Sequence, residues 1–150
     1  MNDFDFLTGT WDVANRWRAD FLDPDSEWEE FPGISHASRH FDGGANFDEI
    51  TFPTKGFSGL TLRLYNPDTG AWSLYWVSKR TGVLFPPVTG QFKDGVGEFF
   101  GEDGHKDVPI RARFRWSGIT ADSARWEQAF SADGGETWVD NWYMDLTRRP

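Results

Sequence analysis

The sequence predicts an all-β protein, a single up-and-down antiparallel β-barrel of about ten strands with a short N-terminal helical turn. Apolar and polar residues alternate on both sides of a turn in the segment 59–78, which is the pattern of a β-hairpin. Similar alternating segments of about eight to twelve residues, each followed by a Gly, Asp or Asn turn, recur along the whole chain. A sheet of this size would expose two edges if it stayed open, and closing it into a barrel removes both.

The expected elements follow the chain in order. Phe4 and Leu7 stand at helical spacing in the segment 3–9, which indicates one helical turn. The strands are expected at residues 10–21, 28–41, 45–52, on either side of the turn 66–70, and at 88–92, 96–100, 108–116, 124–130 and 137–147. The second strand is expected to bulge or bend at Pro32-Gly33. The segment 79–87, which ends in two prolines, is expected to be a connection, and 101–107 a polar loop.

The hairpin at 59–78 also predicts a strand register. If Leu64 lies opposite Trp72, the apolar side chains of both strands form one interior surface, made of Leu60, Leu62, Leu64, Trp72, Leu74 and Trp76. This register places Arg63 and Tyr75 on the opposite face. They would face inward only if the Leu and Trp surface packed outward against a partner subunit.

The composition predicts a single cytoplasmic domain that spans residues 1–150. A chain of 150 residues buries roughly 70% of its unfolded surface, and the absence of cysteine excludes disulfides. The first residues lack the basic and apolar regions of a signal peptide, so none is expected, and no apolar run approaches the ~18 residues of a membrane-spanning helix. A net charge of −9 repels phosphate backbones and anionic bilayers, so neither nucleic acid nor a membrane is expected as a partner.

The aromatic content draws attention to the barrel interior. The chain has 9 Trp and 14 Phe, so rings are expected to line a cavity or to pack edge to face between strands. An eight-stranded barrel is just filled by side chains, and a barrel of about ten strands should therefore keep a cavity. The sequence thus predicts a protein that binds a small hydrophobic or aromatic molecule inside the barrel.

A few polar residues fall on otherwise apolar strand faces and are expected to orient the ligand, because buried polar groups need hydrogen-bond partners. They are Asn15, Gln128, Asp140 and either Asp48 or Glu49. The Gly43-Gly44 turn permits loops of different length, so the sequence leaves open which of these two acidic residues points inward. With the tryptophans of the walls, the expected ligand-binding residues are Asn15, Trp17, His36, Asp48, Trp76, Gln128 and Trp142.

His36 is the candidate for a catalytic residue. On a strand, four residues at ~3.3 Å each place His36 and His40 about 13 Å apart, so they are not expected to share a metal ion. Facing the cavity beside a carboxylate of the third strand, His36 would act as a general base or a polar anchor. The alternative function is therefore an enzyme (an isomerase, cyclase or hydratase) that uses a buried histidine or carboxylate inside the barrel. A homodimer with exposed Trp rings at its interface is a third alternative.

Two further motifs are interpreted as structural. The segment 131–138 fits the Asp-box pattern Ser-x-Asp-x-Gly-x-Thr-Trp, in which Asp and Ser side chains hold the backbone of a hairpin turn. A propeller would need several copies, and the chain has one. Arg111, Arg113 and Arg115 alternate with apolar residues and are expected on the outer face of the barrel.

The chain resembles a known superfamily. Gly9-Thr10-Trp11 is similar to the Gly-x-Trp signature of the calycins, which group lipocalins, fatty-acid-binding proteins and nitrobindins. The segments 4–11, 43–46 and 62–76 resemble uncharacterised bacterial lipocalin-like proteins. The resemblance implies a barrel that binds a small apolar molecule, and it implies no particular reaction. Nitrobindins hold haem through a histidine late in the chain, whereas the last histidine here is His105 in a polar segment, so neither haem nor another cofactor is expected.

Overall fold

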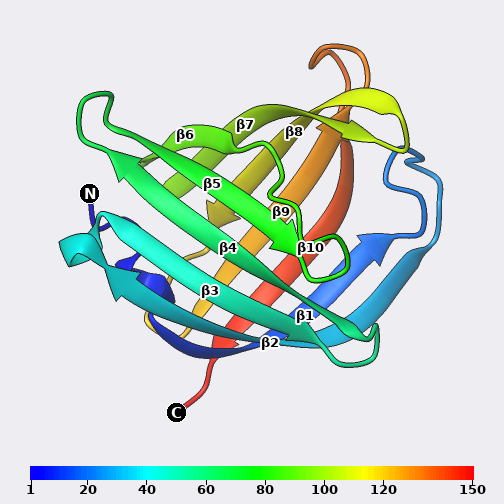
Figure 1. Cartoon of the computed structure of the whole chain (residues 1–150). Helices are drawn as coiled ribbons and strands as arrows, with labels where there is room; N and C mark the ends of the chain where they lie inside the picture. Colours follow the sequence, from blue (N-terminus) through cyan, green and yellow to red (C-terminus); the bar gives the residue numbers. More distant parts are fainter.

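The computed structural model describes residues 1–150 as a closed barrel of antiparallel strands (Figure 1). The strands are β1 (Gly9–Arg18), β2 (Trp28–His40), β3 (Ala45–Phe52), β4 (Phe57–Asn66), β5 (Ala71–Ser78), β6 (Val88–Lys93), β7 (Val96–His105), β8 (Val108–Ser117), β9 (Ser123–Ser131) and β10 (Val139–Arg148). Each strand pairs with its neighbours in sequence, and β1 pairs with β10. The helical elements are two short 3₁₀ helices, η1 (Asp5–Leu7) and η2 (Phe41–Gly43). The predicted fold class, up-and-down order and N-terminal turn are confirmed.

The N-terminal turn fills one end of the barrel, which we call the closed end (Figure 1). Phe4 and Leu7 are buried there, and the Phe4 ring packs against Trp72, Phe92, Phe99 and Trp116. Trp11 is fully buried, and its indole N–H donates a hydrogen bond of 2.9 Å to the carbonyl oxygen of Leu7. The expectation that Trp11 packs under the N-terminal turn is confirmed. The opposite end, reached by the β1–β2, β3–β4, β5–β6, β7–β8 and β9–β10 connections, is called the open end.

The register of β4 and β5 differs from the prediction by one residue. Tyr65, and not Leu64, lies opposite Trp72. The expected turn is 66–70, but Asn66 belongs to β4 and pairs with Ala71, so residues 67–70 form the turn; the Asn66 carbonyl accepts the N–H of Gly70, whose φ is +73°. A slip of one residue moves a strand's side chains to the other face. Thr61, Arg63 and Tyr65 therefore face inward beside Trp72, Leu74 and Trp76, whereas Leu60, Leu62 and Leu64 lie on the outer face.

Three other expectations about the strands are wrong. Residues 101–107 are not a loop, because β7 continues to His105 and turns into β8 through Lys106 and Asp107, both with positive φ. In β10, a bulge between Asp140 and Trp142 turns Asn141 inward and leaves Asp140 outside, where it pairs with Arg113. The bulge expected at Pro32-Gly33 is absent, because β2 pairs with β1 through both residues without a shift in register.

The weakest seam of the barrel lies between β5 and β6. Only three residue pairs join these strands, from Trp72 with Gly90 to Leu74 with Val88. Beyond them the connection 79–87 covers the remaining edge of β5, with a bridge from Val77 to Leu84 and a hydrogen bond of 2.8 Å from the N–H of Phe85 to the carbonyl of Trp76. The expectation of a non-strand connection here is confirmed.

The two structural motifs are also confirmed. Asp133 accepts hydrogen bonds from the Thr137 backbone and hydroxyl, and the Ser131 hydroxyl accepts the N–H of Gly135. These bonds close the β9–β10 hairpin turn. On β8 the three arginines lie on the outer face, where Arg113 pairs with Asp140 and Arg115 with Glu98.

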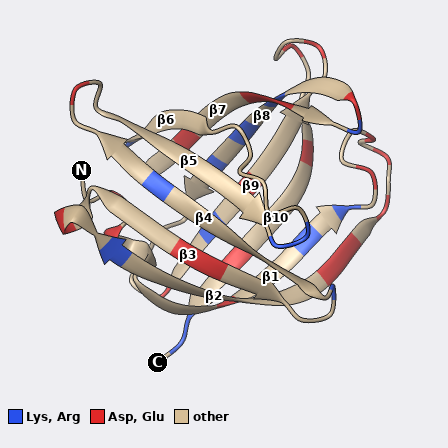
Figure 2. Cartoon of the chain, in the orientation of Figure 1, with Lys and Arg blue, Asp and Glu red and all other residues tan.

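Charges of both signs are spread over the strands and loops of the barrel (Figure 2). Among the helical elements, none is long and apolar enough to span a bilayer.

Candidate functional site

The barrel interior is packed mainly with aromatic rings. At the open end, Trp142 packs against the rings of Trp17, Phe52 and Trp126 at centroid distances of 5.0 to 5.9 Å. At the closed end, the rings around Phe4 form a second group. Other side chains of the interior come from β3, β5, β8 and β10 and line a cavity there: Ile50, Leu74, Phe114, Met144 and Leu146. An interior ligand would therefore meet aromatic rings together with aliphatic side chains.

Arg63 and Asp48 form a charged pair inside this apolar surface. They are the only buried charged side chains, with exposed fractions of 4% and 6%. The Arg63 guanidinium donates through Nη2 to Oδ2 of Asp48 at 2.6 Å and through Nη1 to Oδ1 of Asn46 at 2.7 Å. The open choice between Asp48 and Glu49 is thereby settled, since Asp48 faces inward and Glu49 outward.

The guanidinium of Arg63 still has hydrogen-bonding capacity. It lies 5.3 Å from the ring centroid of Phe4 and 5.7 Å from that of Trp116, which are favourable distances for a cation and a ring. Its Nε is buried and has no hydrogen-bond partner in the protein. An unpartnered N–H in a buried guanidinium is unfavourable by itself, and an acceptor placed beside it would be stabilised.

A small cavity of about 50 Å³ opens beside this pair. Its lining residues all come from the inner faces of the strands: Ser35, Asp48, Ile50, Thr61, Arg63, Leu74, Trp76, Phe114, Trp116, Trp126, Met144 and Leu146. One water needs roughly 10–15 Å³ of such space, so the cavity can accept a few waters or a small fragment of a ligand. The rings of three tryptophans and one phenylalanine surround the charged pair.

The two amides expected to point inward do so. Asn15 and Gln128 have exposed fractions of 2% and 7%. Oδ1 of Asn15 accepts the indole N–H of Trp142 at 3.0 Å, while its Nδ2 has no partner. Gly33 makes room for this amide, because a Cβ at Gly33 would lie 3.0 Å from Nδ2 of Asn15. Gln128 donates to Oδ1 of Asn141 at 2.9 Å, and Asn141 donates to the carbonyl of Phe21.

The predicted site residues do not all meet at one place. Asp48 and Trp76 line the interior cavity. Asn15, Gln128 and Trp142 do not line it and lie nearer the open end. Trp17 is half-buried at the open end, where its indole donates to Glu29. His36 is exposed on the outer face and contacts the hydroxyl of Thr10 at 2.8 Å. The expectation that His36 faces the cavity is therefore wrong, because the inward positions of β2 are the odd-numbered ones from Phe31 to Ala37.

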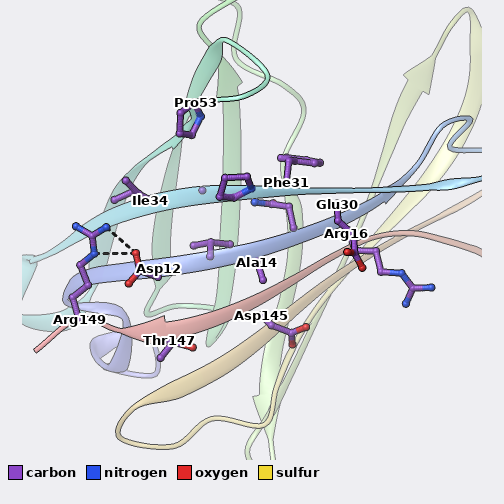
Figure 3. A pocket seen from close by; sticks show the side chains of 14 residues that line it. Asp12, Ala14, Arg16, Glu30, Phe31, Ile34, Pro53, Asp145, Thr147 and Arg149 are labelled. Carbon is purple, nitrogen blue, oxygen red and sulfur yellow. Dashed lines mark hydrogen bonds and ion pairs between the residues drawn. The ribbon is translucent and has the colours of Figure 1, made fainter.

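A larger hollow than the interior cavity lies outside the barrel. It is an open depression of about 830 Å³ over the outer faces of β10, β1 and β2, around Ala14 and Pro32 (Figure 3). Charged side chains rim it, and Asp12 and Arg149 on this rim pair with each other at 2.8 Å (Figure 3). The buried pair of Arg63 and Asp48 does not line this depression, because both residues line the interior cavity.

Comparisons with known proteins support the fold. No family model matches the chain, and no curated protein sequence matches it. Among solved structures, the S-type phycobiliprotein lyase CPES from Guillardia theta is similar, with a TM-score of 0.61 over 98% of this chain and 90% of that chain. The two sequences are 10% identical, so the likeness concerns the fold and not the chemistry of the site.

Arg63 is the main site residue that the sequence analysis missed. The alternation in β4 suggested that its leucines face inward. The turn between Asn66 and Ala71 sets a register that places Arg63 inside instead. The signal that could have found it is chemical. Asn46, Asp48 and Arg63 are the polar and charged residues on one face of two adjacent strands, and that face needs a cation to balance Asp48.

Proposed function

We propose that the barrel binds a small aromatic molecule in its interior, with a polar group of that molecule against Arg63 and Asp48. The observation that carries this proposal is the buried guanidinium with a free Nε, in a cavity walled by Trp76, Phe114, Trp116 and Trp126. An acceptor on the ligand would pair with Nε of Arg63. A donor would pair with Asp48, and the rings would bury the remainder. The Gly9–Trp11 segment supports the further inference that the chain is a calycin.

The cavity has to widen for a ligand larger than a few waters. Typical ligand pockets have ≈ 300–1,000 Å³, far more than the ≈ 50 Å³ seen here. The route that we infer passes Trp76, which is half-buried, lines the cavity and lies on β5 beyond the last residue paired with β6. Displacement of Trp76 together with the connection 79–87 would open the cavity without breaking the other strand pairs.

Fluorescence titration with 4-nitrophenol tests the proposal, because this small planar phenol quenches tryptophan emission when bound near it. The test variant is Arg63→Met with Asp48→Leu, which removes the pair without leaving a lone buried charge. The matched control is Arg115→Met with Glu98→Leu, an ion pair of 2.7 Å on the outer face. We expect the interior variant to lose saturable quenching and the control to keep it. Equal binding by both variants, or no saturable quenching in the unchanged protein, would contradict an interior site.

The enzyme alternative has less support. It relied on His36, which lies outside the barrel, or on a buried carboxylate, and the only one is Asp48, already held in an ion pair. A binding function requires no proton carrier and uses the same residues.

A further inference from the structure

The open end of the barrel carries a second concave site, which we call the rim site. It is a depression of about 360 Å³ between the end of β1, the start of β2 and the β1–β2, β3–β4, β5–β6 and β7–β8 connections. Its lining residues are Trp17, Arg18, Ala19, Phe21, Glu29, Lys55, Arg80, His105 and Lys106. None of them lines the interior cavity. The two sites are therefore made of different side chains.

The rim site is positively charged in an acidic protein. Four of its lining residues are cationic and one is anionic, a local charge of +3, whereas the whole chain has a net charge of −9. Acidic residues outnumber basic ones in the chain by 24 to 15, so a basic depression is not a consequence of composition. Concave basic surfaces with low-dielectric walls concentrate anions.

One of the four cations is paired with a carboxylate, and a second uses its guanidinium on two backbone carbonyls. Lys55 pairs with Glu29, and Arg18 donates to the backbone carbonyls of Ser26 and Asp140. Arg80 and Lys106 have no carboxylate within 4.0 Å.

These two residues come from different loops. Arg80 lies in the β5–β6 connection, and Lys106 lies in the β7–β8 turn. The guanidinium of Arg80 is fixed by a hydrogen bond of 2.8 Å to the carbonyl of Lys55 and by stacking 4.2 Å from the ring centroid of Phe57. An anion between the two loops would meet the guanidinium of Arg80, which is already held in place, and the ammonium of Lys106.

Aromatic rings form the floor of the rim site. The rings of Phe21 and His105 stack with a centroid distance of 5.5 Å and an interplanar angle of 13°, and Phe21 also packs edge to face on Trp17. Nε2 of His105 is buried and has no hydrogen-bond partner. Asp20 is the acidic residue near His105 in the β1–β2 loop, and its carboxylate already accepts the N–H of Leu22 at 3.0 Å. Rings and cations together favour a ligand that has both an aromatic ring and a negative charge.

We propose that the rim site binds a small aromatic anion, a ring that carries a carboxylate, sulfonate or phosphate group. The anionic group lies between Arg80 and Lys106, and the ring lies on Trp17 and Phe21. This site does not depend on the interior site, because the two share no residue.

Two matched probes test the charge requirement. 8-Anilinonaphthalene-1-sulfonate carries the ring and the anion, and N-phenyl-1-naphthylamine has nearly the same rings and no charge. Both become fluorescent when bound. We expect the sulfonate to bind more tightly than the amine. We also expect its affinity alone to fall when NaCl is raised from about 50 to about 500 mM, because salt screens exposed charges.

The variant Arg80→Gln with Lys106→Gln assigns the binding to the rim site. We expect an affinity loss of about tenfold for the sulfonate and no change for the amine, as for removal of two partly exposed charge contacts. The control is Lys79→Gln with Lys93→Gln, which removes the same charge from positions that do not line the rim site. An equal loss in the control, an unchanged affinity in the rim variant, or salt-independent binding by the unchanged protein would each overturn the proposal. A failure of the 4-nitrophenol experiment would leave these results unaffected.

Discussion

Replacement of Arg63 by Met should destabilise the barrel more than any other charge removal in the chain. The substitution keeps the length of the aliphatic side chain but leaves the carboxylate of Asp48 buried without its partner at 2.6 Å. Loss of one member of a buried ion pair costs about 3–5 kcal/mol. Since domains of this kind are stable by about 5–15 kcal/mol, the variant should lose about a fifth of its stability or more.

A double-mutant cycle separates the charge effect from the packing effect. Asp48→Leu alone leaves a buried guanidinium and should also cost several kcal/mol. Arg63→Met with Asp48→Leu should recover most of both losses, because an apolar pair of similar volume can replace a buried ion pair at little cost. Urea titrations monitored by tryptophan fluorescence give the four free energies of unfolding. If Arg63→Met costs less than about 1 kcal/mol, or if the two single losses add in the double variant, Arg63 is not a buried partner of Asp48.

Three further predictions concern single side chains. Trp11→Ala should cost about 3–5 kcal/mol in a denaturant titration, because it empties a fully buried site under the N-terminal turn; a loss under about 1 kcal/mol would contradict that placement. Burial, and secondarily the charge of Lys106, lowers the pKa of His105 below its ordinary 6.5. The unfolded chain therefore takes up this proton first, and stability falls as the pH drops below about 6.5; His105→Gln should reduce that fall between pH 7.5 and 5.5, and identical pH profiles would refute it. Hydrogen bonds from Thr137 and Ser131 lower the pKa of Asp133 from 3.8 to about 2. Its contribution is present above pH 3.8 and is lost as the pH falls toward 2, so Asp133→Asn should lose less stability than the unchanged protein between pH 5 and pH 3.

The sequence was sufficient for the fold because most strands alternate without ambiguity. In β1, Trp11, Val13 and Asn15 share one face, and all three are buried as that pattern requires. Asn15 could also be recognised as an inward amide, since its neighbours on that face are large and apolar.

The site was only partly predictable because its residues depend on register, which turns and bulges determine. A difference of one residue in the register set by the β4–β5 turn exchanges Leu62 for Arg63 inside the barrel. A bulge in β10 likewise replaces Asp140 by Asn141. In some strands, both the odd-numbered and the even-numbered residues include apolar side chains, so alternation alone does not distinguish the two faces. For such strands the pattern shows that a strand exists and leaves open which face is buried.

The short β5–β6 seam has a consequence for association between chains. A closed barrel hides its strand edges, but separation of three residue pairs would expose the edges of both β5 and β6. The segment that would be uncovered with them ends in Pro86 and Pro87, which have no N–H to donate and cannot extend a β-ladder. The proline pair therefore protects the barrel at the place where it opens most easily, and its replacement by Thr-Thr would leave the native contacts of β5 and β6 in place while removing that protection against edge-to-edge aggregation.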